Sequence, residues 1–227
     1  MTEPASAPLP VVILISGRGS NLQAIIDAVA RGTLTVDIRA VISNRPDAAG
    51  LQRATRAGIT TAVVDHTLYT DRLAFGQALQ TCIDHYQPAL VILAGFMRIL
   101  SDDFVAHYRG RMLNIHPSLL PDFPGLHTHQ RAIDAGCKLH GASVHFVTAD
   151  IDGGPLIVQT RVPVRTDDNA DSLAARVLEQ EHHLYPQAIS WFAEGRLTLD
   201  ENGQALLDGA ILTVPRQRPA TGSEAVW

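Results

Sequence analysis

The chain has 227 residues, of which 46% are apolar and 18% charged, a composition that is ordinary for a soluble globular protein. Its formal net charge of -5 and its pI near 6.0 argue against nucleic-acid partners, which usually meet a basic surface. It has no apolar run of membrane-spanning length, no signal-peptide pattern in MTEPASAPLP and two widely separated cysteines, so we expect a cytoplasmic protein without a membrane partner.

The first part of the chain alternates apolar runs of strand length with segments of helical spacing. We expect strands at 10–17, 36–44, 59–65 and 89–95, and helices at 20–32, 48–58 and 70–87. Ser20 and Gln23 fit a capping box at the start of the first helix. This alternation predicts an α/β fold with a doubly wound, Rossmann-like parallel sheet, in which ligands lie beyond the carboxyl ends of the strands.

The second part of the chain predicts a smaller mixed half with a long helix. We expect helices after Ser101 and at 127–136 and 169–194, strands at 111–116, 141–150 and 155–164, and a hairpin around Asn202-Gly203. The predicted division is a phosphate-binding half at 10–108 and a catalytic half at 109–215. Residues 1–9 and 216–227 are expected to be flexible tails.

The segment SGRGSN (16–21) lies between the first strand and the first helix. Its glycines permit close backbone approach, and the free N–H groups and the dipole at a helix N-terminus favour a phosphate. It is not a dinucleotide fingerprint, because Leu22 occupies the third glycine position and the second strand ends in SNRP without an acidic residue. The same sequence also fits a tight turn before a well-capped helix.

Asn114 and His116 stand at the end of a strand, just before the proline-rich segment PSLLPDFPG. Spacing by two residues places both side chains on one face of the strand. The amide can stabilise an oxyanion and the imidazole can move a proton, so the pair suits an acyl centre. A histidine at a strand end can equally be structural.

Asp152 precedes Gly153-Gly154-Pro155 and is a candidate to orient His116. A turn aspartate that caps backbone N–H groups is the alternative. The histidines of HTH (127–129), with His140 and His145, raise the question of a metal site. Because no H-E-x-x-H or equivalent spacing occurs, we predict no metal.

Several segments together closely resemble the glycinamide ribonucleotide formyltransferases, which belong to the formyltetrahydrofolate enzyme family. They are LISGRGSNLQAIIDA, LAGFMRIL, LNIHPSLLPDFPGLHTH, HGASVHFVTADIDGGPLIVQ and QEHHLYP, and the resemblance runs from about Val11 to Leu197. HPSLLP is typical of the wider group, whereas SGRGSNLQAI together with PGLHTH is typical of this member.

The resemblance implies roles for individual residues. The catalytic residues would be Asn114, His116 and Asp152. The ribonucleotide would be bound by Gly19, Ser20, Asn21, Gly95, Pro117 and Glu181. The folate would be bound by Arg72, Met97, Arg98, Ile99, Leu100, Asn114, Thr148, Ala149, Asp150, Ile151 and Asp152.

The implied reaction moves the formyl group of 10-formyltetrahydrofolate to the amine of N1-(5-phospho-D-ribosyl)glycinamide in de novo purine (IMP) synthesis. The products would be the N2-formyl compound and tetrahydrofolate, formed by direct transfer through a tetrahedral intermediate. Asn114 and protonated His116 would hydrogen-bond its oxyanion, and Asp152 would orient His116 and assist proton movement. The expected protein is a monomer or homodimer with small-molecule substrates. The alternatives are a formyltetrahydrofolate hydrolase, a formyltransferase acting on another amine, and a non-catalytic phosphate-binding module.

Overall fold

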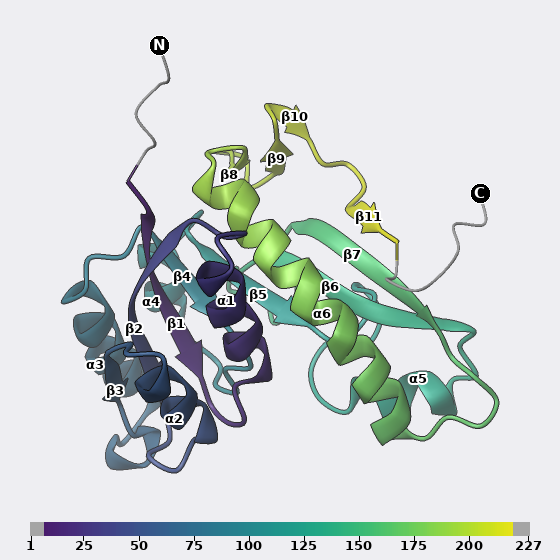
Figure 1. Ribbon diagram of the computed structural model, residues 1–227, viewed down its shortest axis with the longest axis horizontal. Coiled ribbons are helices and arrows are strands. Elements are labelled where there is room, and N and C mark those ends of the chain that lie inside the picture. Colours follow the sequence, from purple (N-terminus) through teal and green to yellow (C-terminus); the bar gives the residue numbers. More distant parts are fainter. Residues whose placement is uncertain (1–6, 220–227) are drawn as a thin grey trace.

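An eight-stranded sheet forms the centre of the fold in the computed structural model, which describes residues 7–219 (Figure 1). Its strand order is β11-β7-β6-β5-β4-β1-β2-β3. The strands are β1 (Leu9–Ile15), β2 (Val36–Ser43), β3 (Thr61–Val63), β4 (Leu90–Leu93), β5 (Met112–His116), β6 (Leu139–Phe146), β7 (Leu156–Pro163) and β11 (Arg216–Arg218). The predicted α/β fold with a large, mainly parallel sheet is therefore confirmed.

Helices cover both faces of this sheet, with α1 and α6 on one face in Figure 1 and α3 and α4 on the other. The helical elements are α1 (Ser20–Ala30), α2 (Ala49–Arg56), η1 (His66–Leu68), α3 (Arg72–Asp84), α4 (Asp102–His107), α5 (Thr128–Asp134) and α6 (Ala170–Ala193). Strand β1 is apolar throughout because both of its faces are buried. Ile13 packs in the cluster that includes α1 and α6, whereas Leu14 packs with residues of α3 and α4.

The chain changes direction across the sheet beside β1. From β1 it proceeds to β2 and β3 on one side, and it then crosses to β4, which pairs in parallel with the other side of β1. The carboxyl ends of β1 and β4 therefore meet at a topological switch point, where open α/β sheets bind their ligands.

The sheet continues without a break into the second part of the chain. Strand β4 pairs in parallel with β5, so the predicted boundary at 108–109 falls inside one sheet. Strand β6 then runs antiparallel to both β5 and β7, as expected for a mixed half.

The end of the described chain adds two features. A small sheet of β8 (Leu197–Leu199), β9 (Ala205–Leu207) and β10 (Ala210–Ile211) confirms the hairpin predicted around Asn202-Gly203. The prediction of a flexible tail from residue 216 is wrong for β11, because its backbone pairs in parallel with the edge of β7. Residues 1–6 and 220–227 of the predicted tails lie outside the described residues.

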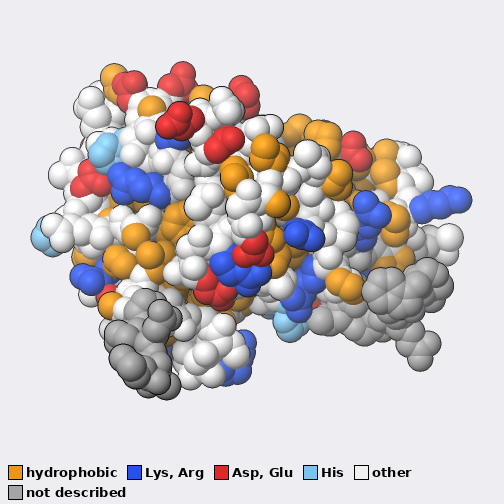
Figure 2. Space-filling view, turned by 90° about the horizontal axis from the view of Figure 1, so that it is seen from above, with side chains coloured by type: hydrophobic (Ala, Val, Ile, Leu, Met, Phe, Trp, Pro, Cys, Tyr) orange, Lys and Arg blue, Asp and Glu red, His pale blue; other side chains and the backbone are white. Residues whose placement is uncertain are grey.

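The described surface is mixed in charge. Figure 2 shows acidic and basic side chains interspersed among apolar ones on the upper face, with no broad basic area in the part of it that is described. Within residues 7–219, no helix combines the length and the apolar character that crossing a bilayer requires.

Candidate active site

The loop between β1 and α1 turns sharply at Gly19. This residue has φ +70°, in the left-handed region that glycine adopts without strain, and it is the N-cap of α1. The predicted capping box is therefore wrong, since Ser20 is the first helical residue and makes no cap. The side chain of Gln23 instead donates to Asp27 at 2.8 Å. The N-terminus of α1 is left without a side-chain cap, and its first N–H groups are available to a ligand.

A cavity of about 390 Å³ opens at the switch point, where this loop meets the segment after β4. It brings together six of the predicted binding residues, namely Gly19, Ser20, Asn21, Gly95, Met97 and Arg98. The same cavity is lined by Ser16, Gly17 and Arg18 of the predicted phosphate segment. It is also lined by Asn44, Arg45, His66 and Ala94, which the sequence had not identified as binding residues. Three of these side chains, those of Arg18, Arg45 and His66, are basic residue types that suit an anionic group.

A buried hydrogen-bond network joins the floor of the cavity to the segment after β4. The hydroxyl of Ser16 donates to Asn44 Oδ1 at 2.5 Å and accepts from the backbone N–H of Met97 at 2.7 Å. The Asn44 amide lies 3.1 Å from His66 Nδ1. The only local signal for this network is that Ser16 and Asn44 directly follow β1 and β2, so the sequence does not indicate the part played by His66 or by the backbone of Met97.

Glu181 of α6 is not among the residues that line the cavity, but it is hydrogen-bonded to Asn21, which is. The Asn21 amide donates to Glu181 Oε2 at 2.7 Å, which links the start of α1 to the middle of α6. Glu181 is only 6% exposed, and burial raises the pKa of this carboxyl, with the Asn21 hydrogen bond opposing the shift. A buried carboxylate beside the loop favours a ligand that brings a compensating N–H or positive group.

The three predicted catalytic residues lie together at the end of β5. His116 Nδ1 is 3.3 Å from Asp152 Oδ2, which also accepts from the backbone N–H of Gly125 at 2.8 Å. Asp152 has φ +53°, a left-handed conformation that aims its carboxylate at the ring. His116 Nε2 is 2.9 Å from the carbonyl oxygen of Phe123. Both ring nitrogens therefore face hydrogen-bond acceptors.

His145 completes this cluster, although the sequence indicated it only as a possible metal ligand. It lies opposite Asn114 in the antiparallel register of β5 and β6. Its Nδ1 is 2.8 Å from the carbonyl oxygen of Phe146, which can only accept, and burial lowers the pKa of the ring. The neutral ring therefore presents an unprotonated Nε2, which accepts from the Asn114 amide at 3.1 Å. This hydrogen bond fixes which way the amide points.

The remaining predicted folate residues occupy two loops and one distant helix. Ile99 and Leu100 continue the segment after β4, whereas Thr148, Ala149, Asp150 and Ile151 belong to the loop between β6 and β7. Three apolar side chains on these loops are exposed, namely Met97 (64%), Ile99 (54%) and Ile151 (57%).

Two other predicted binding residues lie apart from these loops. Arg72 is the first residue of α3 and is not part of the cavity lining. Pro117 directly follows β5, and its carbonyl oxygen accepts from the hydroxyl of Thr128 at 2.7 Å.

The described residues contain no group of three or more His, Cys, Asp or Glu side chains that could hold a metal ion. The histidine cluster instead forms pairs, such as His140 Nε2 with His129 Nδ1 at 3.2 Å. The fold and this edge of the sheet are typical of an α/β transferase. An uncapped helix N-terminus faces one cavity, and an oriented amide, imidazole and carboxylate lie at the end of β5, the strand next to β4.

Comparison with known proteins identifies the family to which this chain is similar. A family model described as formyl transferase matches residues 9–189. The chain is 56% identical over 202 residues to phosphoribosylglycinamide formyltransferase of Escherichia coli (strain K12), a match that covers 89% of this chain and 95% of that protein. The Haemophilus influenzae phosphoribosylglycinamide formyltransferase is 45% identical over 202 residues, with the same two coverages.

A solved structure of phosphoribosylglycinamide formyltransferase from Coxiella burnetii superposes with a TM-score of 0.89 at 53% identity. That match covers 93% of this chain and 100% of the other. The chain belongs to the formyl transferase family, as its resemblance in sequence predicted.

Proposed function

We propose that this protein is a phosphoribosylglycinamide formyltransferase, which moves the formyl group of 10-formyltetrahydrofolate to the amine of N1-(5-phospho-D-ribosyl)glycinamide. One observation carries the proposal beyond family membership. Leu93 of β4 is the register partner of Asn114 of β5, so the cavity segment that starts at Ala94 adjoins the catalytic end of β5. An anion site and an acyl-transfer cluster are thus neighbours on one sheet edge.

The ribonucleotide would be bound along the first loop. The phosphate would accept from the N–H groups of Gly19, Ser20 and Asn21 at the N-terminus of α1. The glycinamide end would then extend along Gly95 towards Glu181, whose buried carboxylate suits an amino group.

The folate would lie between the loop after β4 and the loop between β6 and β7. Exposed Met97, Ile99 and Ile151 offer apolar contacts to a planar ring system. The hydroxyl oxygen of Thr148 is buried without a hydrogen-bond partner among the described residues, so it is free to bond a polar ring edge. These residues therefore fit the folate. Arg72 would contact only its far, glutamate end.

The residues at the end of β5 would then carry the transfer. The acceptor amine attacks the formyl carbon, the new C–N bond forms and the bond from carbon to folate N10 breaks. Asn114, fixed by His145, and an N–H of His116 would hydrogen-bond the oxygen that becomes negative in between. The N–H at His116 Nε2 would have to leave the carbonyl oxygen of Phe123 and donate to this oxygen instead. Asp152 would hold the ring and help the amine proton reach N10, through water.

The parts of the chain would divide this work. We propose that 10–108 supplies the phosphate loop and that 109–215 supplies the formyl-transfer residues. We further propose that the protein works in the cytoplasm as a monomer or homodimer, with small molecules rather than nucleic acid as its partners.

The test is an assay of tetrahydrofolate release from 10-formyltetrahydrofolate, with and without the ribonucleotide acceptor. We expect release only with the acceptor, and we expect His116→Ala and Asn114→Ala each to lower kcat by about 10²–10³. Release that does not depend on the acceptor would instead identify a hydrolase. Variants with near-normal kcat/KM would show that the two residues are not catalytic.

A further inference from the structure

Helix α2 packs against the back of the phosphate loop through Gly50. This residue is buried, and its backbone N–H donates to the carbonyl oxygen of Gly17 at 2.9 Å. A Cβ on Gly50 would lie 2.6 Å from Ile15 Cδ1 and 3.2 Å from Gly19 Cα, so a larger residue would displace the Ile15 side chain and press on the loop backbone. The loop and α2 are therefore in direct backbone contact.

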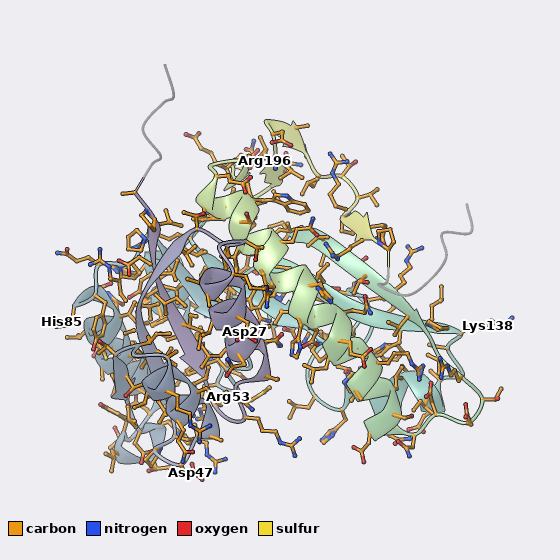
Figure 3. All side chains as sticks on the ribbon, in the orientation of Figure 1. Asp27, Asp47, Arg53, His85, Lys138 and Arg196 are labelled. Carbon is orange, nitrogen blue, oxygen red and sulfur yellow. The ribbon has the colours of Figure 1, made fainter. Side chains whose placement is uncertain are left out.

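Arg53, one turn further along α2, binds the next carbonyl of the same loop. Its Nε donates to the backbone oxygen of Arg18 at 2.8 Å, and its Nη1 donates to Gln23 Oε1 at 3.3 Å. Figure 3 labels Arg53 beside the turn that connects β1 to α1. Arg53 is not among the residues that line the cavity, so it acts on the loop from behind.

These two contacts have an electrostatic consequence for an anion in the cavity. A loop that binds phosphate must turn its N–H groups towards the ligand and its carbonyl oxygens away, because the oxygens repel an anion. Both carbonyls of the loop turn, those of Gly17 and Arg18, are bonded by α2. The guanidinium also adds a positive charge behind the loop without touching the ligand.

We propose that Gly50 and Arg53 are positioning residues for phosphate recognition, since they hold the carbonyls of Gly17 and Arg18 away from the cavity. The inference rests on the proposed function, because it assumes that this loop binds the ribonucleotide phosphate. It predicts that loss of Arg53 weakens binding of phosphorylated ligands selectively. The formyl folate, which occupies the other side of the site, should not be affected.

Arg53→Ala tests this through KM values and through competitive inhibition by ribose 5-phosphate. We expect the KM for the ribonucleotide and the Ki of ribose 5-phosphate to rise about 10-fold, as for loss of one hydrogen bond to a charged group. We expect kcat and the KM for the formyl folate to stay within about 2-fold of the wild-type values, and Arg53→Lys to recover part of the loss. Arg56→Ala is the matched control, because Arg56 is exposed at the end of the same helix.

The outcomes separate this inference from the proposed function. An unchanged Ki for ribose 5-phosphate in Arg53→Ala would overturn the positioning role. An equal loss for the acceptor with and without its phosphate would also overturn it, because a general distortion of the site would then be the cause. A wild-type protein that neither binds ribose 5-phosphate nor formylates the acceptor would instead refute the proposed function itself.

Discussion

We expect the buried carboxylate of Glu181 to destabilise the free protein, although it would bind the acceptor substrate in the proposed complex. Glu181→Gln keeps the shape and the hydrogen bond from Asn21 but removes the charge. Because burial raises the pKa of Glu181 above its ordinary 4.5, the folded protein becomes less stable as pH rises through the interval above that value. At pH 7.5 we expect the variant to be more stable by about 1–2 kcal/mol, which corresponds to about 3–6 °C in Tm.

Thermal unfolding at pH 5 and pH 7.5 measures the change in stability, and steady-state kinetics measure the change in acceptor binding. The gain in Tm should be smaller at pH 5, because more of the wild-type carboxyl is protonated at the lower pH and then resembles the amide. The KM for the ribonucleotide acceptor should rise about 10- to 100-fold, as expected when a charged hydrogen-bond partner is lost. The KM for the formyl folate should change little.

Glu179→Gln is the control, since Glu179 lies on the exposed side of the same helix and should change neither quantity. A Glu181→Gln variant that is less stable than wild type at pH 7.5 would refute the reasoning about burial. A variant with a normal KM for the acceptor would refute the assignment of Glu181 to the substrate.

Three further substitutions test other parts of the molecule. Asn44→Leu removes the acceptor of the Ser16 hydroxyl, which itself accepts from the backbone N–H of Met97. We expect the KM for the formyl folate to rise about 5-fold in steady-state assays. Burial lowers the pKa of His140 to about 4, so the wild type should lose about 2–3 kcal/mol of stability between pH 6.5 and pH 4. Urea unfolding of His140→Gln should lack that loss. Gly154→Ala would place a Cβ 1.8 Å from the carbonyl oxygen of Phe146, and its unfolding free energy should fall by at least about 2 kcal/mol.

The sequence predicted what depends on local pattern. The apolar run of β1 is continuous because both of its faces are covered, and this places the loop at Gly19 correctly at a strand end. The cap of α1 was mispredicted, because the spacing of Ser20 and Gln23 fits a capping box whether or not the residue before Ser20 is left-handed. In the structure the Gln23 side chain bonds Asp27 and Arg53 instead. Contacts between α1 and α2, which local spacing does not reveal, therefore set the position of the Gln23 side chain.

Pairings between distant segments could not be predicted in the same way. His145 lies 31 residues from Asn114, and only the antiparallel register of β5 with β6 brings the two together. The sequence from residue 216 predicted a flexible tail, but the edge of β7 offered backbone partners to β11. The resemblance named Asn114, His116 and Asp152 together as the catalytic residues, an assignment that stays a prediction. The contacts of His116 and Asp152 with Phe123 and Gly125 come from a loop with no local signal for its path.

The change from parallel to antiparallel pairing explains how the proposed catalytic residues come together at β5. In a parallel pair, successive strands are joined by a crossover, and each strand end contributes one separate loop, as at the switch point beside β1. Because β6 returns antiparallel to β5, a residue of β6 lies directly opposite Asn114, and the loop that follows β6 turns back over the end of β5. That geometry delivers His145 to the amide and Asp152 to the ring of His116. We therefore infer that the parallel strands create the cavity and that the antiparallel strand orients the side chains that the proposed transfer needs.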